Sequence, residues 1–298
     1  MTTPNAVTTR PKTELAPIDP AVIKRFPALD AGEREELLEL LTENFDTDSG
    51  EAMSVKNLTM VKVPSGTSPA IFGYREDGQD KDAKEIEGVI IGWQNRRNYW
   101  ESVEVTGERP DCSSRDGKIG EGMYGRGSGE NPTGECGTCP MGQWSDGPDG
   151  ARIPAPCKPQ QAILLMVPDE VFPWYVQVPR TSQKGFKTYR ADLLKKRKGV
   201  AQVTTKLTLN KIKAATKGAY DYYEIVFTMG DDLGRSAKKA ALELGEAMMP
   251  ILNAAPPVTS AADTDNVVPG EGGVTVATVH DHGGVSIDRD YSEEDVPA

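Results

Sequence analysis

With 298 residues, 37% of them hydrophobic, the chain can bury the core of one large domain or of two small ones. No apolar run approaches the ~20 residues of a membrane-spanning helix, and the first residues lack the apolar stretch of a secretory signal. These features argue against a membrane partner and for a cytoplasmic location. The formal charge of -11 would argue against a nucleic-acid partner, but the distribution of the charge along the chain matters more than its sum.

The N-terminal part of the chain changes from a polar stretch to a helical pattern. Residues 1–29 are polar and contain several prolines, so we expect them to be disordered. Residues 30–45 repeat leucine at helical spacing behind Asp30, which predicts a helix capped by that aspartate. Short strands with alternating apolar residues are predicted at residues 58–63 and 71–74.

The rest of the body alternates between strand and helix patterns. The acidic, glycine-containing stretch 76–84 is expected to be a loop. Residues 85–94 have the apolar centre of a buried strand, and 96–106 form its continuation or its hairpin partner. Later predicted elements are strands at 162–167 and 171–178, a helix at 182–198 capped by Ser182, strands at 200–209 and 220–229, and a helix at 231–249 ended by Pro250.

The number of short strands sets the expected fold class. It favours a mainly β domain with flanking helices, of the α+β class, over residues 30–252. An OB-like antiparallel barrel fits this count, as do other small barrels or a sandwich. Residues 107–160 are interpreted as an insertion because their glycines, prolines and small polar residues cannot bury a core. Residues 253–298 lack strand or helical periodicity, which predicts a disordered acidic tail.

All four cysteines lie in this insertion, namely Cys112, Cys136, Cys139 and Cys157. Cys136 and Cys139 form a CxxC knuckle, whose inner glycine lets the backbone turn both sulfurs toward one ion. Structural zinc takes four thiolate or imidazole ligands in a tetrahedron, so the sequence predicts a four-cysteine structural zinc site. Two disulfides, or a redox CxxC with two bystanders, are the alternatives, and thiols in a reducing compartment favour metal binding.

Residues able to carry acid–base catalysis are scarce in the predicted domain. The only histidines, His280 and His282, lie in the tail, so the body has no histidine general base. Asp111, Asp116 and Lys118 imitate the PD…DxK pattern of metal-dependent nucleases, at a spacing too short for the two strands that pattern occupies. We therefore expect no catalysis, with a nuclease-like enzyme as the alternative.

Positive charge is concentrated in one part of the chain. Residues 155–220 hold thirteen Lys and Arg against three acids, whereas residues 253–298 hold nine acids and one arginine. Binding of single strands needs a cationic groove with aromatic faces on which bases stack. The candidate contact residues are Trp93, Arg96, Arg97, Tyr99, Trp100, Trp174, Arg180, Lys184, Lys187, Arg190, Lys206, Lys211, Lys213 and Tyr222.

The acidic tail ends in a cluster formed by Asp288, Asp290, Glu293, Glu294 and Asp295. It has three interpretations: a segment that competes with nucleic acid for the basic surface, a docking peptide for replication or recombination proteins, and a solubilising extension. A protein that acts as an inhibitor through this tail, without nucleic acid, is a further alternative.

Together these features resemble phage-encoded single-stranded DNA-binding proteins of the OB-fold type with an embedded zinc module. The segments GWQNRRNYWE, PDCSSRDGKIGEG, CGTCP and PCK are also similar to proteins of actinobacterial phages. The resemblance implies an OB fold, cooperative coating of single strands, and a role in phage DNA replication or recombination in the cytoplasm of a bacterial host. The chain departs from the family in having no histidine among the expected ligands and in ending with Ala298 rather than an aromatic residue.

Overall fold

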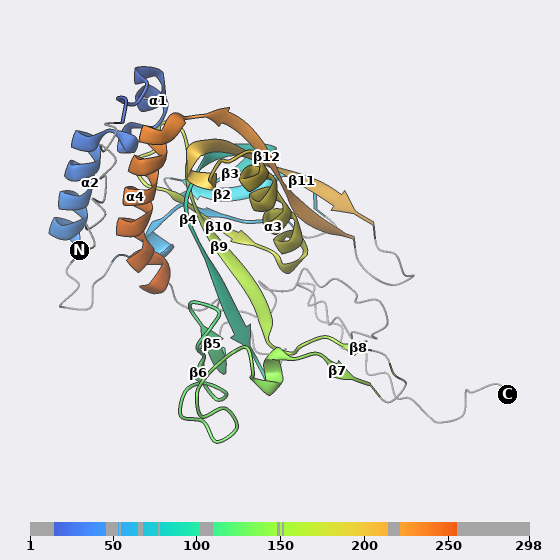
Figure 1. The fold of residues 1–298 in the computed structure, drawn as a ribbon. Helices are drawn as coiled ribbons and strands as arrows, with labels where there is room; N and C mark the ends of the chain where they lie inside the picture. Colours follow the sequence, from blue (N-terminus) through green and yellow to red (C-terminus); the bar gives the residue numbers. More distant parts are fainter. Residues whose placement is uncertain are drawn as a thin grey trace, which may run out of the picture.

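The computed structural model describes residues 15–45, 53, 55–64, 68–76, 78–101, 110–147, 150, 152–213 and 221–254. Its α-helices are α1 (Pro20–Arg25), α2 (Ala31–Asn44), α3 (Arg180–Lys195) and α4 (Gly234–Ala254). Its longer strands are β2 (Phe72–Glu76), β3 (Gln79–Ala83), β4 (Glu85–Tyr99), β9 (Lys158–Met166), β10 (Trp174–Val178), β11 (Val203–Ile212) and β12 (Tyr222–Asp232). Its shortest strands are β1 (Met60–Val61), β5 (Cys112–Ser114), β6 (Glu121–Gly122), β7 (Ser145–Asp146) and β8 (Arg152–Ile153). The chain is thus a mixed α+β protein with a sheet-rich core (Figure 1).

The main sheet is organised around β4, which is a single strand of 15 residues. The order of strands is β1-β10-β9-β4-β11-β12. On one side β4 pairs with β9 over most of its length. On the other side its first residues pair with β11 and its last residues, 97–99, pair with β5. The predicted strands 85–94 and 96–106 are therefore continuous through residue 99, and the residues from 102 to 109 lie outside the described part.

Helices cover both faces of this sheet because apolar side chains alternate along its strands. On one face Ile91 and Leu164 pack with η1 (Pro27–Leu29), α2 and the apolar side of α4. On the other face Ile90 and Leu165 pack against Phe186 of α3 and the β2–β3 hairpin. Figure 1 shows α2 and α4 on one side of the sheet and α3 on the other. The three layers bury the hydrophobic core.

The sheet does not form the predicted barrel. Within the described residues the strand path is open, with β1 at one edge and β12 at the other, and no ladder joins them. The sheet is also not wholly antiparallel, because β1 pairs with β10 in parallel. An antiparallel barrel needs every strand to pair on both sides, and α3 instead lies against the β12 edge.

Three local expectations are corrected. Residues 20–29, expected to be disordered, form α1 and η1 and bury Phe26 and Leu29 completely. The expected loop 76–84 is the turn and second strand of the β2–β3 hairpin. Pro250 lies inside α4 rather than ending it. By contrast, the helix behind Asp30 is confirmed, since the Asp30 side chain accepts a hydrogen bond from the Gly32 N–H.

Side chains in the first turn of α3 form hydrogen bonds with backbone groups at the edge of β12. Ser182 was predicted to cap this helix, but the helix begins at Arg180 behind Pro179. The buried Ser182 Oγ instead accepts a hydrogen bond of 2.8 Å from the Ile225 N–H. One residue earlier, the Thr181 Oγ1 donates to the Tyr223 carbonyl. Two hydroxyls therefore pair edge groups that would otherwise be open.

Ser182→Ala should destabilise the fold by about 1–3 kcal/mol because the buried Ile225 N–H loses its acceptor. Urea unfolding monitored by circular dichroism measures the change. Thr188→Ala, an exposed position on the same helix, is the control and should shift stability by less than about 0.5 kcal/mol. Equal stability of the two variants would show that the edge does not depend on this hydroxyl.

Candidate metal centre and nucleic-acid interface

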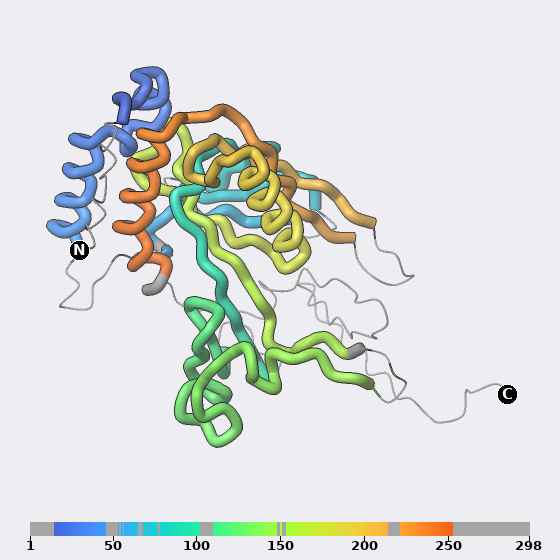
Figure 2. The backbone as a smooth tube through the Cα atoms, in the orientation of Figure 1, coloured from blue at the N-terminus to red at the C-terminus, as the bar shows by residue number. Residues whose placement is uncertain are grey.

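The cysteine module, defined here as residues 110–157, stands at the end of a two-stranded arm. The arm consists of the second half of β4 and the first half of β9, which run side by side out of the layered body (Figure 2). Turns shape the module locally. Asp116 Oδ1 accepts hydrogen bonds from Ser114 Oγ and from two backbone N–H groups, which orders the turn after β5. Gly122, at φ +114°, is required because a Cβ there would lie 2.2 Å from the Asp111 carbonyl.

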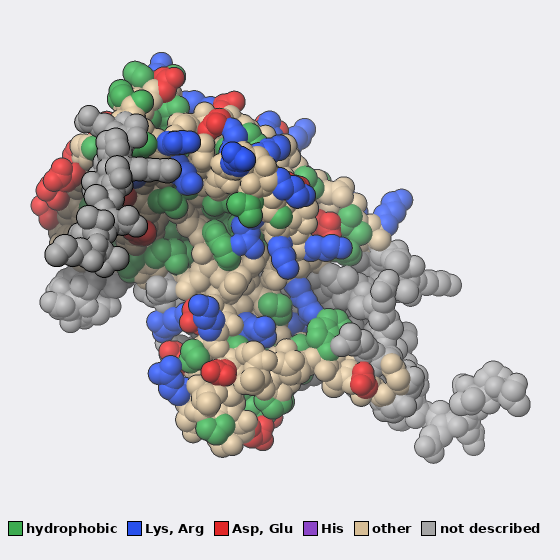
Figure 3. All heavy atoms as spheres, viewed as in Figure 1, with side chains coloured by type: hydrophobic (Ala, Val, Ile, Leu, Met, Phe, Trp, Pro, Cys, Tyr) green, Lys and Arg blue, Asp and Glu red, His purple; other side chains and the backbone are tan. Residues whose placement is uncertain are grey.

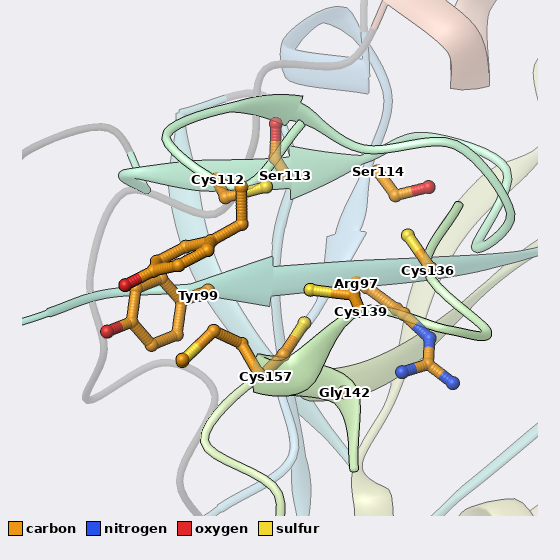
Figure 4. Close-up of a pocket in the computed structure, with 11 residues that line it drawn as sticks. Arg97, Tyr99, Cys112, Ser113, Ser114, Cys136, Cys139, Gly142 and Cys157 are labelled. Carbon is orange, nitrogen blue, oxygen red and sulfur yellow. The ribbon is translucent and has the colours of Figure 1, made fainter. Parts of the chain in front are cut away.

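The fold brings the four cysteines together. Cys112 begins β5, Cys136 and Cys139 belong to the knuckle, and Cys157 immediately precedes β9. All four are buried and line one small pocket, together with Tyr99, Tyr124 and Met141. Figure 4 shows that their side chains approach from different segments. Two backbone hydrogen bonds hold the segments in place, Cys136 N–H to the Lys118 carbonyl and Cys157 N–H to the Met141 carbonyl.

The surroundings of the pocket disfavour deprotonation of the thiols. Burial, assisted by the neighbouring cysteines, raises the pKa of Cys157 from 9.0 to about 12. Burial likewise raises the pKa of Cys112 and of Cys136. Some donors act in the opposite direction: the Tyr124 backbone hydrogen bond lowers the pKa of Cys112, and the Arg97 guanidinium lowers that of Cys157. Several adjacent thiolates can coexist here only if a cation compensates their charge.

The residues fit a sulfur-ligated ion in their chemistry. Four thiols without a disulfide line one pocket, and hydrogen-bond donors stand beside two of them. The positions of the four thiols are not those of a metal site. Within the part of the chain that the structure describes, no group of three or more His, Cys, Asp or Glu is placed to hold an ion. Zinc therefore stays a prediction: the four donors line one pocket, and no coordination geometry is shown among the described residues.

Five of the predicted nucleic-acid contacts lie inside the protein or in the thiol pocket. Arg96, Trp100 and Trp174 are buried, with exposed fractions of 5%, 8% and 6%. Tyr99 is also buried, and it packs edge-on against Tyr124 in the module. Arg97 lines the thiol pocket (Figure 4). The four buried residues were wrong as surface contacts, because consecutive residues of a strand face opposite sides and both faces of the sheet are covered. Arg97 is half-buried.

Arg96 has a structural role at the end of α4. Its Nη2 donates to the Leu252 carbonyl, where the negative end of the helix dipole favours a cation. Burial lowers its pKa, and the neighbouring Tyr175 opposes that effect. The side chain thus connects β4 to the last turn of α4.

Of the four cations predicted on α3, Lys184 and Lys187 are exposed, and Arg180 and Arg190 are half-buried. Arg180, Lys184 and Lys187 recur at helical spacing and form what we call the cationic stripe. Lys184 and Lys187 are exposed and have no ion-pair partner among the described residues. Figure 3 shows Lys and Arg side chains over α3 and onward to the cysteine module.

Trp93 lies under this helix and is partly accessible. The Arg190 Cζ stands 3.9 Å from the Trp93 ring centroid, and Phe186 meets the same indole edge-on at 5.9 Å between centroids. The stacked guanidinium keeps Trp93 next to the cationic stripe. Arginine planes also stack on nucleobases, and this pair is half-buried.

Trp144 is a candidate contact residue that the sequence reasoning missed. It is 47% exposed, and the Arg180 Cζ of α3 lies 5.7 Å from its ring centroid. A tryptophan within a segment of glycines, prolines and small polar residues has few apolar neighbours to bury it, and this signal could have identified it. Trp144 and the cationic stripe therefore meet where the module approaches the body.

The remaining cations belong to the β11–β12 hairpin, whose strand β12 packs against α3. Lys206 pairs with Glu85 and Lys211 pairs with Asp221. Lys213 is exposed and Tyr222 is partly buried. The two ion pairs reduce the net charge that this hairpin offers to a ligand.

The nuclease alternative finds no supporting geometry in the described residues. Asp111 and Asp116 flank the three-residue strand β5 rather than lying on adjacent strands. Asp111 Oδ2 accepts a hydrogen bond from the Glu101 N–H, and Asp116 Oδ1 accepts one from the Ile119 N–H within its own turn. Lys118 is exposed beyond that turn.

The predicted acidic tail has no structural test. The acids of the tail, from Asp288 to Asp295, lie outside the described residues. No helix among the described residues is long and apolar enough to cross a membrane. Comparison of the chain with protein-family models, curated proteins and solved structures finds no match.

Proposed function

We propose that the protein binds single-stranded DNA through the face that carries the cationic stripe, as an accessory factor in phage replication or recombination. The observation that carries the proposal is the stripe itself, in which Arg180, Lys184 and Lys187 share one face of α3 beside two tryptophans. Phosphates supply most of the affinity of such proteins through contacts with Lys and Arg. Aromatic and guanidinium planes provide stacking without base preference.

The four-cysteine module is proposed to hold one structural zinc ion. When bound, the metal would supply the cross-link that a segment with almost no core lacks. Cys112, Cys136, Cys139 and Cys157 would hold it, with the Tyr124 N–H and the Ser114 side chain supporting the sulfurs.

A binding titration tests the function. Fluorescently labelled single-stranded and double-stranded oligonucleotides of one sequence are titrated with the intact chain at low salt, and anisotropy is measured. The proposal predicts tighter binding of the single strand, because only unpaired bases can stack on the tryptophan and arginine planes. Equal affinity for both forms, or association with neither, would contradict it.

The tail is proposed to dock replication or recombination proteins rather than to create the affinity for DNA. Its net charge of -8 is opposite to what phosphates bind. An inhibitor acting only through its tail would need no cationic stripe, and the stripe favours nucleic acid over that alternative.

A further inference from the structure

The cysteine module approaches the cationic stripe through Trp144. The indole is 47% exposed, and the Arg180 guanidinium of the body lies over its ring. An exposed aromatic ring beside an arginine matches the stacking platforms of single-strand binders. The ring therefore stands where a base could be held between the two parts of the molecule.

The position of Trp144 depends on the knuckle. The Gly142 N–H donates 2.9 Å to the Cys139 carbonyl, and the Gln143 Nε2 donates 2.5 Å to the Gly137 carbonyl. Gly142 has to be glycine because a Cβ there would lie 2.8 Å from the Cys136 carbonyl. The residues immediately before Trp144 are thus fastened to the segment that carries two of the four thiols.

The module and α3 also share an anchor on β9. The Gln183 Nε2 donates 2.8 Å to the Pro159 carbonyl, two residues after Cys157. The Cys157 N–H in turn donates 2.8 Å to the Met141 carbonyl, in the turn that leads to Trp144. The thiol pocket is consequently linked on one side to the indole and on the other to the helix of the stripe.

We infer that the cysteine module is the second half of the strand-binding surface, with Trp144 as a base-stacking residue whose position is set by metal bound to the four thiols. The inference rests on the proposed function and adds two claims to it. A single DNA strand contacts α3 and the module at the same time. Loss of the metal weakens binding of the DNA because Trp144 is no longer held in position. The ligand is an unpaired nucleobase, which any sequence can supply.

The test compares Trp144→Ala, Trp144→Phe and Met123→Ala by oligonucleotide anisotropy. Trp144→Ala should weaken single-strand binding by about 10-fold, and Trp144→Phe should recover most of it because a ring remains. Met123 is the control, since it has the same 47% exposure in the same module. Circular dichroism checks that each variant is folded.

A second readout does not depend on DNA. The fluorescence of Trp144 is obtained as the difference between wild type and Trp144→Phe, with and without a zinc chelator. The inference predicts that chelation shifts this emission to longer wavelength and increases its quenching by acrylamide. Unchanged emission would overturn the metal dependence, and wild-type affinity of Trp144→Ala would overturn the stacking role. Failure of the wild-type chain to bind the single strand would instead overturn the proposed function.

Discussion

Chelation of the metal is expected to unfold the cysteine module while the layered body stays folded. The two large core clusters lie in the body, whereas the described part of the module contributes Cys112 and Cys157 to one small cluster with Tyr99 of β4 and two partly buried neighbours. Structural zinc contributes on the order of 10 kcal/mol in small modules, far more than this cluster can replace. Hydrogen exchange followed by mass spectrometry should show that protection disappears in residues 110–157 and is retained in β10.

Cys136→Ser is the matched variant for this experiment, because it keeps the size of the side chain and removes a thiolate ligand. Its exchange pattern should resemble that of the chelated wild type. Elemental analysis of the wild type should find one zinc per chain. Slow exchange throughout the module in the presence of chelator would mean that the turns and hydrogen bonds fold it alone, and the metal proposal would then be wrong.

Reversing two charges of the cationic stripe, as Lys184→Glu with Lys187→Glu, is expected to weaken single-strand binding by about 10-fold or more. Both lysines are exposed and lack an ion-pair partner in the described part of the chain, so reversal costs little folding energy. For single strands, each phosphate that a cation no longer neutralises makes the slope of log affinity against log salt less steep by about 0.7. The double variant should therefore make that slope less steep by about 1.4.

The control for this variant changes the net charge by the same amount elsewhere. Arg235→Glu with Lys239→Glu places two reversals one turn apart on α4, which covers the opposite face of the sheet. It should leave the slope unchanged and reduce affinity only through the overall charge, and circular dichroism checks that loss of the exposed Lys239–Glu243 ion pair leaves this variant folded. If both double variants lose affinity equally, the stripe is not the binding surface.

Patterns within a short stretch of sequence predicted individual helices and strands more accurately than they predicted how the strands pair. The leucine repeat behind Asp30 gave the correct helix and cap, because both depend on residues close in sequence. The barrel was not found, since strand pairing depends on distant partners and β4 proved to be one strand shared by β9, β11 and β5. Ser182 is a second example. Its place in the sequence suggested a helix cap, but its hydrogen-bond partner, the Ile225 N–H, is 43 residues away.

For the site, the cysteine spacing predicted a shared pocket, whereas three of the five predicted aromatic contacts are buried. Trp100 and Trp174 are apolar enough to be buried, and composition does not reveal which side of a strand is covered. Trp144 was overlooked because it lies apart from the basic segment in the sequence. Its neighbour Arg180 comes from α3, 36 positions later, so only the fold brings them together.

The salt dependence of single-strand affinity for the intact chain tests the central claim most directly. If phosphates bind the cationic stripe, log affinity falls linearly with log salt, with a slope of about -2 or steeper for the three cations of the stripe. The single strand should remain preferred over the duplex throughout the titration. An affinity that does not change with salt would contradict the account.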